Sequence, residues 1–323
     1  MRDHPRIEIG LNAAIVSMRD GHPVILHTAG DHNDKEALPY GGFNPLKHRT
    51  MEEGLRRLVE EQTGLLAGYV EQLYTFGDRG RMVSADDTSP HVISVGYLAL
   101  SRQIEETDMI AKPNNAAWRN WYEYFPWENW WKERPILLDE IILPTLLDWA
   151  HSADAKSHIV RGLDTISRVK ISFGLDGAAW TDNMVLDRYE LMYSAGLVDE
   201  AMADGRTQVT TSEVQLGKPM LHDHRRILAT AIDRLRGKLK YRPVIFELMP
   251  DRFTLLELQK TVESIFGRAI HKGNFRRLVE NAELVEPTGE SQSATGGRPA
   301  ALFRFRADIL KERPAPGLKV GLG

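Results

Sequence analysis

The pattern of apolar and polar positions in the first hundred residues predicts strands around one helix. Two apolar runs, IEIGLNAAIVSM (7–18) and PVILHT (23–28), are separated by a short polar turn and are typical of a hairpin. Runs at 69–78 and 91–100 also have strand character, and the second alternates clearly. Between the two pairs, Thr50 precedes an amphipathic segment with a glutamate three residues later, the capping-box spacing of a helix start. We therefore expect an α/β domain with a mixed sheet between helices.

The stretch from about 104 to 215 has a different pattern. Its segment 118–135 holds five of the chain's seven tryptophans, and apolar helical segments follow at 141–150 and 187–201. Clustered tryptophans can form a cage for a ligand. At helical spacing, however, they more often pack in a core or a subunit interface, which favours packing. We expect a helical insertion in the first domain, with dimerisation as its role.

A helical pattern over 223–239, followed by Pro243, marks the end of the first part of the chain. Beyond it, Thr254 precedes one predicted helix, a short turn follows, and 271–284 predicts a second helix. A β-hairpin with a Gly/Ser/Thr-rich tip completes the pattern. This order is typical of a winged helix-turn-helix. We expect two domains, 1–240 and 241–323.

Basic side chains lie on both elements with which a winged helix contacts DNA. The second helix enters the major groove, and the hairpin tip can enter a minor groove. The candidate DNA-binding residues are Lys272, Asn274, Arg276 and Arg277 on the second helix and Arg298 at the tip. Acidic residues of both elements lie beyond this cluster. Many winged helices bind only proteins, but this coincidence favours DNA.

Composition narrows the remaining classes of function. The net charge of −4 argues against a uniformly basic coat, yet the chain from Leu239 onward has 14 basic and 10 acidic residues. The absence of cysteine excludes disulfides, zinc–thiolate sites and a thiol nucleophile. No leader-like start and no run of about 18 apolar residues is present, so we expect no membrane partner and a cytoplasmic location.

The segment RRLVEEQTGL (56–65) resembles the Nudix box of phosphate-cleaving enzymes, whose core is REUXEEXGU with U aliphatic. In that box, carboxylates one helical turn apart hold Mg²⁺ against a pyrophosphate. The positions that match are Arg57, Val59, Glu61, Gly64 and Leu65. A plain alternative is an exposed charged helix with supporting pairs four residues apart.

Three carboxylate positions of the box have changed. Leu58, Gln62 and Arg49 stand where glutamates are expected. Leucine is no metal ligand, an amide is a poor one for Mg²⁺, and arginine repels the ion. We therefore expect no metal site, no catalytic residues and no enzyme.

The box, its flanks and the tail together resemble the Nudix-related transcriptional regulators of NAD metabolism, the NrtR family and its longer NadQ-type members. The flanks are LPYGGF (38–43) and the strands around the box, and the tail motifs are FTLLELQ and GNFRRLVE. The resemblance covers 7–100 and 216–306. It implies a homodimer that represses NAD-biosynthesis genes and leaves its operator DNA when its Nudix domain binds an NAD-related nucleotide. The effector is NAD, ADP-ribose or ATP, and no cofactor is required.

The resemblance also implies where the nucleotide binds. Arg57 and Glu61 lie on the box helix, and a ring, that of Tyr40 or of Phe76, stacks on a base. Arg79 and Arg81 contact phosphate. A hinge at 240–248 would move the recognition helices.

Two other functions stay open. One is an active Nudix hydrolase of ADP-ribose-like nucleotides with a fused DNA-binding tail, and the other is a protein whose winged helix docks a partner protein.

Overall fold

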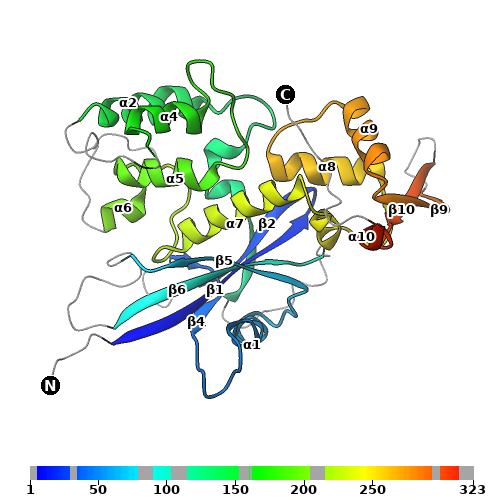
Figure 1. Ribbon diagram of the computed structural model, residues 1–323, viewed down its shortest axis with the longest axis horizontal. Coiled ribbons are helices and arrows are strands. Elements are labelled where there is room, and N and C mark those ends of the chain that lie inside the picture. The colour runs from blue at the N-terminus through cyan, green and yellow to red at the C-terminus, as the bar shows by residue number, and fades with distance from the viewer. Residues whose placement is uncertain are drawn as a thin grey trace.

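A mixed sheet forms the centre of the first domain (Figure 1). The computed structural model describes residues 6–29, 35–78, 90–102, 115–152, 160, 162–203, 215–292 and 299–312. In the sheet the strand order is β3-β2-β1-β6-β5, with β4 paired to β1 and β7 paired to β2. β1 and β6 run parallel, and the other pairs are antiparallel. The strands are β1 (Ile7–Arg19), β2 (His22–Ala29), β3 (Glu36–Ala37), β4 (Tyr40–Gly42), β5 (Tyr69–Phe76), β6 (His91–Leu100) and β7 (Ala117–Asn120). The predicted mixed sheet is confirmed.

Helices cover both faces of this sheet. On one face lies α1 (Met51–Thr63), which buries Leu55 and Val59 against β1 and β6. On the other lies α7 (His224–Leu239), whose apolar stripe joins the larger core. Thr50 caps α1 as predicted, because its side chain accepts the backbone N–H of Glu53 at 3.1 Å.

The Trp-rich segment is buried, but it is not one helix. Its first residues form β7, which extends the sheet beside β2, and two short 3-10 helices follow. Trp118, Trp121 and Trp127 are buried, which confirms packing, while Trp131 is 43% exposed. Further elements are η3 (Trp121–Glu123), η4 (Pro126–Glu128), η5 (Leu138–Ile142), α2 (Leu143–Ala150), α4 (Thr165–Phe173), α5 (Val185–Ser194) and α6 (Asp199–Ala203).

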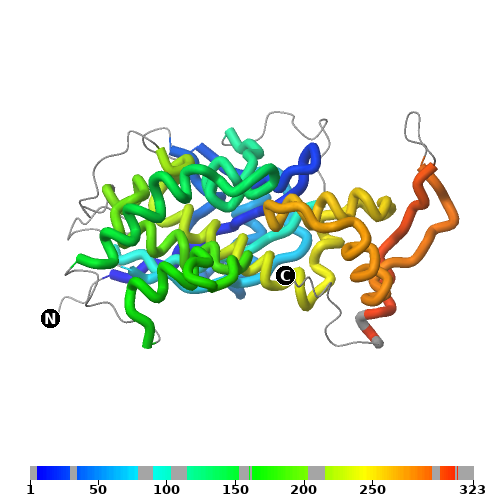
Figure 2. The backbone as a smooth tube through the Cα atoms, turned by 90° about the horizontal axis from the view of Figure 1, so that it is seen from above, coloured from blue at the N-terminus to red at the C-terminus, as the bar shows by residue number. Residues whose placement is uncertain are grey.

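The tail forms the predicted winged helix at one end of the molecule (Figure 2). A capping box at Thr254 and Glu257 starts its first helix, and Gly267, with a φ of 73°, ends it. A three-stranded sheet of order β8-β10-β9 completes it. The elements are η6 (Val244–Leu248), β8 (Phe253–Thr254), α8 (Leu255–Phe266), α9 (Lys272–Ala282), β9 (Val285–Gln292), β10 (Ala300–Phe305) and α10 (Ile309–Glu312).

The helix α8 packs against the first domain and is not merely linked to it by the chain. The hydroxyl of Tyr122 donates to the backbone oxygen of Ser264 at 2.7 Å, and Arg236 donates to that of Ile265 at 2.9 Å. Apolar residues of α8 and of the first domain share one core cluster. The expected hinge at 240–248 includes the short helix η6, in which Val244, Ile245 and Leu248 are buried. This joint is packed, so a hinge motion there has to open the core.

In the ranges that the structure describes, no helix is both long enough and apolar enough to cross a membrane.

Candidate nucleotide cleft and DNA-binding surface

A cleft of about 570 Å³ lies between α1 and the segment that contains β4. Its lining residues are Gly42, Asn44, Lys47, His48, Gly54, Arg57, Leu58, Glu61 and Gln62. Two of the predicted nucleotide-binding residues, Arg57 and Glu61, are thus together in one cleft. Lys47 adds a second positive charge to the same wall, which suits a phosphorylated ligand.

Two of the changed box positions, Leu58 and Gln62, line this cleft, and their side chains contact the segment that contains β4. The side-chain amide of Gln62 accepts the backbone N–H of Tyr40 at 3.2 Å and donates to the backbone oxygen of Tyr40 at 2.8 Å. A carboxylate has no hydrogen to donate, so a glutamate cannot make the second bond when ionised. Leu58 packs against Gly41 so closely that a Cβ there would lie 2.5 Å from a leucine methyl carbon.

The carboxylates of α1 are divided between two sides of the helix. Glu61 lines the cleft, whereas Glu52, Glu53 and Glu60 line a separate hollow of about 380 Å³. Glu53 is further engaged by the backbone N–H of Arg49 at 3.0 Å. Among the described residues no three His, Asp or Glu side chains gather as metal ligands. The described part of the cleft therefore does not fit the carboxylate cluster that Mg²⁺ requires in a Nudix enzyme.

Tyr40 connects the cleft to the first turn of α7. Its half-buried ring lies edge-on to the ring of His224, with centroids 4.9 Å apart. The backbone N–H of Leu38 donates to Nδ1 of His224 at 3.1 Å. Burial lowers the pKa of His224 to about 3, with a smaller contribution from His222, so the ring is neutral near pH 7. The sequence pattern contained no sign of this contact.

The other predicted nucleotide contacts are not part of this cleft as the structure describes it. Phe76 is 5% exposed and packs in the core on the α7 face of the sheet, with the guanidinium of Arg226 5.2 Å from its ring centroid. It therefore offers no open face to a base. Arg79 and Arg81 lie outside the described residues.

The second helix of the winged helix, α9, exposes the predicted basic residues. Phe275 and Val279 bury its inner side, while Lys272, Asn274, Arg276 and Arg277 are exposed. Arg277 donates to the side-chain oxygen of Asn274 at 2.7 Å, which orients both side chains together. Arg276 pairs with Glu280 at 3.0 Å, so one acidic residue lies within the basic cluster rather than beyond it. Arg298 lies outside the described part of the chain.

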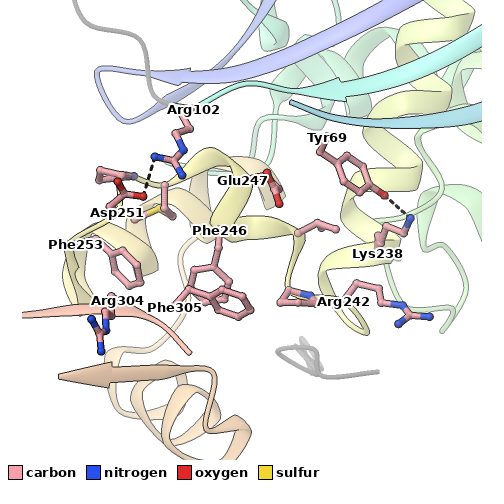
Figure 3. A pocket seen from close by; sticks show the side chains of 14 residues that line it. Tyr69, Arg102, Lys238, Arg242, Phe246, Glu247, Asp251, Phe253, Arg304 and Phe305 are labelled. Atoms are coloured by element: carbon pink, nitrogen blue, oxygen red, sulfur yellow. Dashed lines mark hydrogen bonds and ion pairs between the residues drawn. The ribbon is translucent and has the colours of Figure 1, made fainter. Parts of the chain in front are cut away.

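A groove of about 730 Å³ separates the sheet domain from the wing (Figure 3). Stacked rings of Phe246 and Phe305 form part of its wall, with centroids 4.5 Å apart. Across the groove, Arg102 pairs with Asp251 at 2.8 Å, and Lys238 donates to the hydroxyl of Tyr69 at 2.6 Å (Figure 3). These cations are already paired within the protein, and we assign the groove no ligand.

Comparison with known proteins identifies the tail. The family model of the NrtR DNA-binding winged helix domain matches residues 245–305. This segment is an NrtR-type winged helix. The resemblance predicted from the sequence is thereby confirmed for this segment.

Relatives of known sequence and structure extend the likeness beyond the NrtR-type winged helix. The chain is 41% identical over 95 residues, 29% of its length, to the ADPR responsive transcriptional repressor NtrR of Acinetobacter baylyi. That match spans only 38% of the relative.

Solved structures show that the whole chain shares one fold with such proteins. Shewanella oneidensis NrtR complexed with a 27mer DNA has a TM-score of 0.54 at 19% identity, covering 94% of this chain and 95% of that one. A MutT/nudix family protein from Enterococcus faecalis has a TM-score of 0.51 at 14% identity, covering 95% and 89%. The predicted fold class, a Nudix-like domain followed by a winged helix, is confirmed.

Proposed function

We propose that this protein is a transcriptional repressor of NAD-biosynthesis genes that binds operator DNA through α9 and the wing and is released by a nucleotide in the Nudix-like cleft. The observation that carries the proposal is the joining of an NrtR-type winged helix to a Nudix fold in which Gln62 and Leu58, where we expect glutamates of the box, contact Tyr40 and Gly41. The Acinetobacter relative is named as an ADPR-responsive repressor, and the Shewanella protein was crystallised with DNA. ADP-ribose is therefore our first choice of effector, ahead of NAD and ATP.

The proposed working form is a homodimer with two recognition helices. A two-fold dimer presents two copies of α9 to a palindromic operator, one helical turn or a multiple of it apart. Size-exclusion chromatography with light scattering tests this state without DNA. A monomer at micromolar concentration would contradict it.

The deciding experiment is a gel-shift titration on promoters of NAD-biosynthesis genes and on the protein's own upstream DNA. We expect a specific shift that ADP-ribose relieves, with the nucleotide recovered chemically intact. Arg277→Ala should move the shift to higher protein concentration, while Lys170→Ala, a similarly charged change on the exposed side of α4, should leave it unchanged. A winged helix that docks only a protein would bind none of these promoters.

The retained carboxylate of Glu61 in the cleft favours one alternative, an active hydrolase. Such an enzyme would cleave ADP-ribose with Mg²⁺ at an enzyme-like rate, and Glu61→Gln would abolish that turnover. Chromatography of the nucleotide after the gel-shift assay separates the two functions. Our proposal expects no turnover in either protein.

A further inference from the structure

Gln62 occupies a position at which a Nudix hydrolase has a glutamate, and its neutral amide makes contacts that a glutamate cannot make. It bonds to both the N–H and the oxygen of Tyr40, in a segment 22 positions away in the chain. Leu58, one turn earlier on α1, packs under Gly41. Both side chains therefore contact the same short segment, at Tyr40 and Gly41, and the next residue of that segment, Gly42, lines the nucleotide cleft.

The same segment is fastened on its other side to the start of α7. The backbone N–H of Leu38 bonds to the ring of His224, the first residue of that helix, and the ring of Tyr40 lies against it. His224 is fully buried, so a shift of this segment meets a packed side chain rather than solvent. Because a packed interior is hardly compressible, a shift of residues 38–42 would displace the start of α7.

The far end of α7 holds the DNA-binding domain. Arg236 lies twelve residues after His224, which is about 18 Å along a helix that rises about 1.5 Å per residue. Its side chain is 1% exposed, and its guanidinium donates to the backbone oxygen of Ile265 in α8 at 2.9 Å. Within the described residues, α7 is thus pinned to the cleft wall at one end and to the winged helix at the other.

We propose that Gln62 is the positioning residue that passes the presence of nucleotide in the cleft to the winged helix, through residues 38–42 and then α7. A ligand that fits between Arg57, Lys47 and the wall at Gly42 binds one position of this wall better than another. The differential affinity for the two positions is what shifts the DNA-binding form. This inference rests on the proposed function, because it concerns the release of DNA.

The test compares Gln62→Glu with a matched control, Gln72→Glu. Gln72 is exposed on β5, and its side-chain oxygen only accepts a hydrogen bond, from the hydroxyl of Tyr97 at 3.4 Å. A glutamate keeps that bond at position 72 but loses the donor to Tyr40 at position 62. Gln62→Met, neutral and of similar length, serves as a second variant and replaces Gln62→Glu if the added charge unfolds the protein.

Four quantities are measured for each variant: operator affinity without ligand, ADP-ribose affinity by calorimetry, the ADP-ribose concentration that releases half of the DNA, and the rate of amide exchange in residues 38–42. For the Gln62 variants we expect operator affinity without ligand within about threefold of the wild type, and the effect on release is judged after correction for any change in ADP-ribose affinity, because Gln62 lines the cleft. The concentration needed for release should rise about tenfold or more, the size of a typical allosteric coupling. Amide exchange of residues 38–42 should also become faster. Gln72→Glu should match the wild type in all four measurements.

Two outcomes overturn the inference. Release that changes only in proportion to ADP-ribose affinity would make Gln62 a ligand contact, and unchanged release would make it a local structural residue. A wild-type protein that fails to bind operator DNA, or whose DNA complex ignores every nucleotide, would instead overturn the proposed function itself.

Discussion

The carboxylate of Glu128 lies 2.6 Å from the guanidinium of Arg236, and both side chains are 1% exposed. Glu128 belongs to the Trp-rich segment, and its other oxygen pairs with the buried Arg188 of α5 at 2.6 Å. Burial opposes the charge on Glu128, yet the two guanidinium groups hold its pKa below the usual range. The insertion thus fixes the arginine that holds α8, which gives this segment a structural role apart from the dimerisation we predicted.

Glu128→Gln should destabilise the protein strongly. The change leaves two buried guanidinium groups with too little negative charge, and breaking a buried ion pair costs about 3–5 kcal/mol. Asp139→Asn is the matched control, because it removes an exposed pair with Arg134, worth less than about 1 kcal/mol. Urea unfolding followed by tryptophan fluorescence measures both free energies of unfolding. Similar losses in the two variants would contradict the prediction.

Asp233 should make the fold less stable as the pH rises. Its side chain accepts the backbone N–H of Val185 at 2.9 Å, and burial raises its pKa from 3.8 to about 7. Between these values the folded protein holds a proton that the unfolded chain releases, so the free energy of unfolding falls with increasing pH. Asp233→Asn keeps the acceptor oxygen and removes the titration. We expect the variant to lack this decline and to be the more stable protein above about pH 7. Free energies of unfolding from urea that change with pH in the same way for the wild type and for Asp233→Asn would contradict this prediction.

His224 should have the opposite effect at acid pH. Its pKa is lowered from 6.5 to about 3. At a pH between these two values, the ring binds a proton in the unfolded chain but not in the folded protein. The stability of the wild type therefore falls as the pH drops below about 6.5. His224→Asn retains an acceptor near the N–H of Leu38 and cannot titrate. As the pH falls from about 7 to 4, the melting temperature should fall less steeply for this variant than for the wild type. An equally steep fall in both proteins would contradict the role of His224.

Arg277 and Arg276 are neighbours on α9 but should differ in their contribution to DNA binding. Arg277 is oriented by Asn274, whereas Arg276 is paired with Glu280. We expect Arg277→Ala to weaken operator binding about 5- to 150-fold, as for the loss of one base contact worth about 1–3 kcal/mol. Arg276→Ala should reduce operator affinity less, because Arg276 has to break its pair with Glu280 before it can contact DNA. Glu280→Ala removes that pair and should increase operator affinity. Fluorescence anisotropy with labelled operator at several salt concentrations measures these effects. Equal losses for the two arginines would contradict the distinction.

Features governed by neighbouring residues could be predicted from the sequence. The caps at Thr50 and Thr254 follow from side chains that bond within one helical turn. The strand over 91–100 was also predicted, but residues 94–100 are buried without alternation, because helices cover both faces of the sheet. The basic face of α9 is also a local pattern, since its apolar residues alone decide which side is buried.

Features that depend on distant parts of the chain could not be predicted in this way. The pairing of Gln62 with Tyr40 and the burial of Val244, Ile245 and Leu248 arise from tertiary packing. The same holds for β7, whose residues the tryptophan spacing assigned to a helix but which pair with the free edge of β2. For the candidate site, the sequence predicted that three glutamates of the box have been replaced, and only the structure showed what Gln62 and Leu58 contact.

The seating of α8 has a consequence for how the chain is made. The surface that receives Ile265 and Phe266, which includes Tyr122 and Arg236, is synthesised well before these residues. Domains fold as units during synthesis. The apolar surface of the larger domain that receives α8 therefore stays exposed until α8 leaves the ribosome. The winged helix is consequently also the last part of the first domain's core to be synthesised, and a nascent chain that ends before α8 would expose the apolar surface that α8 covers.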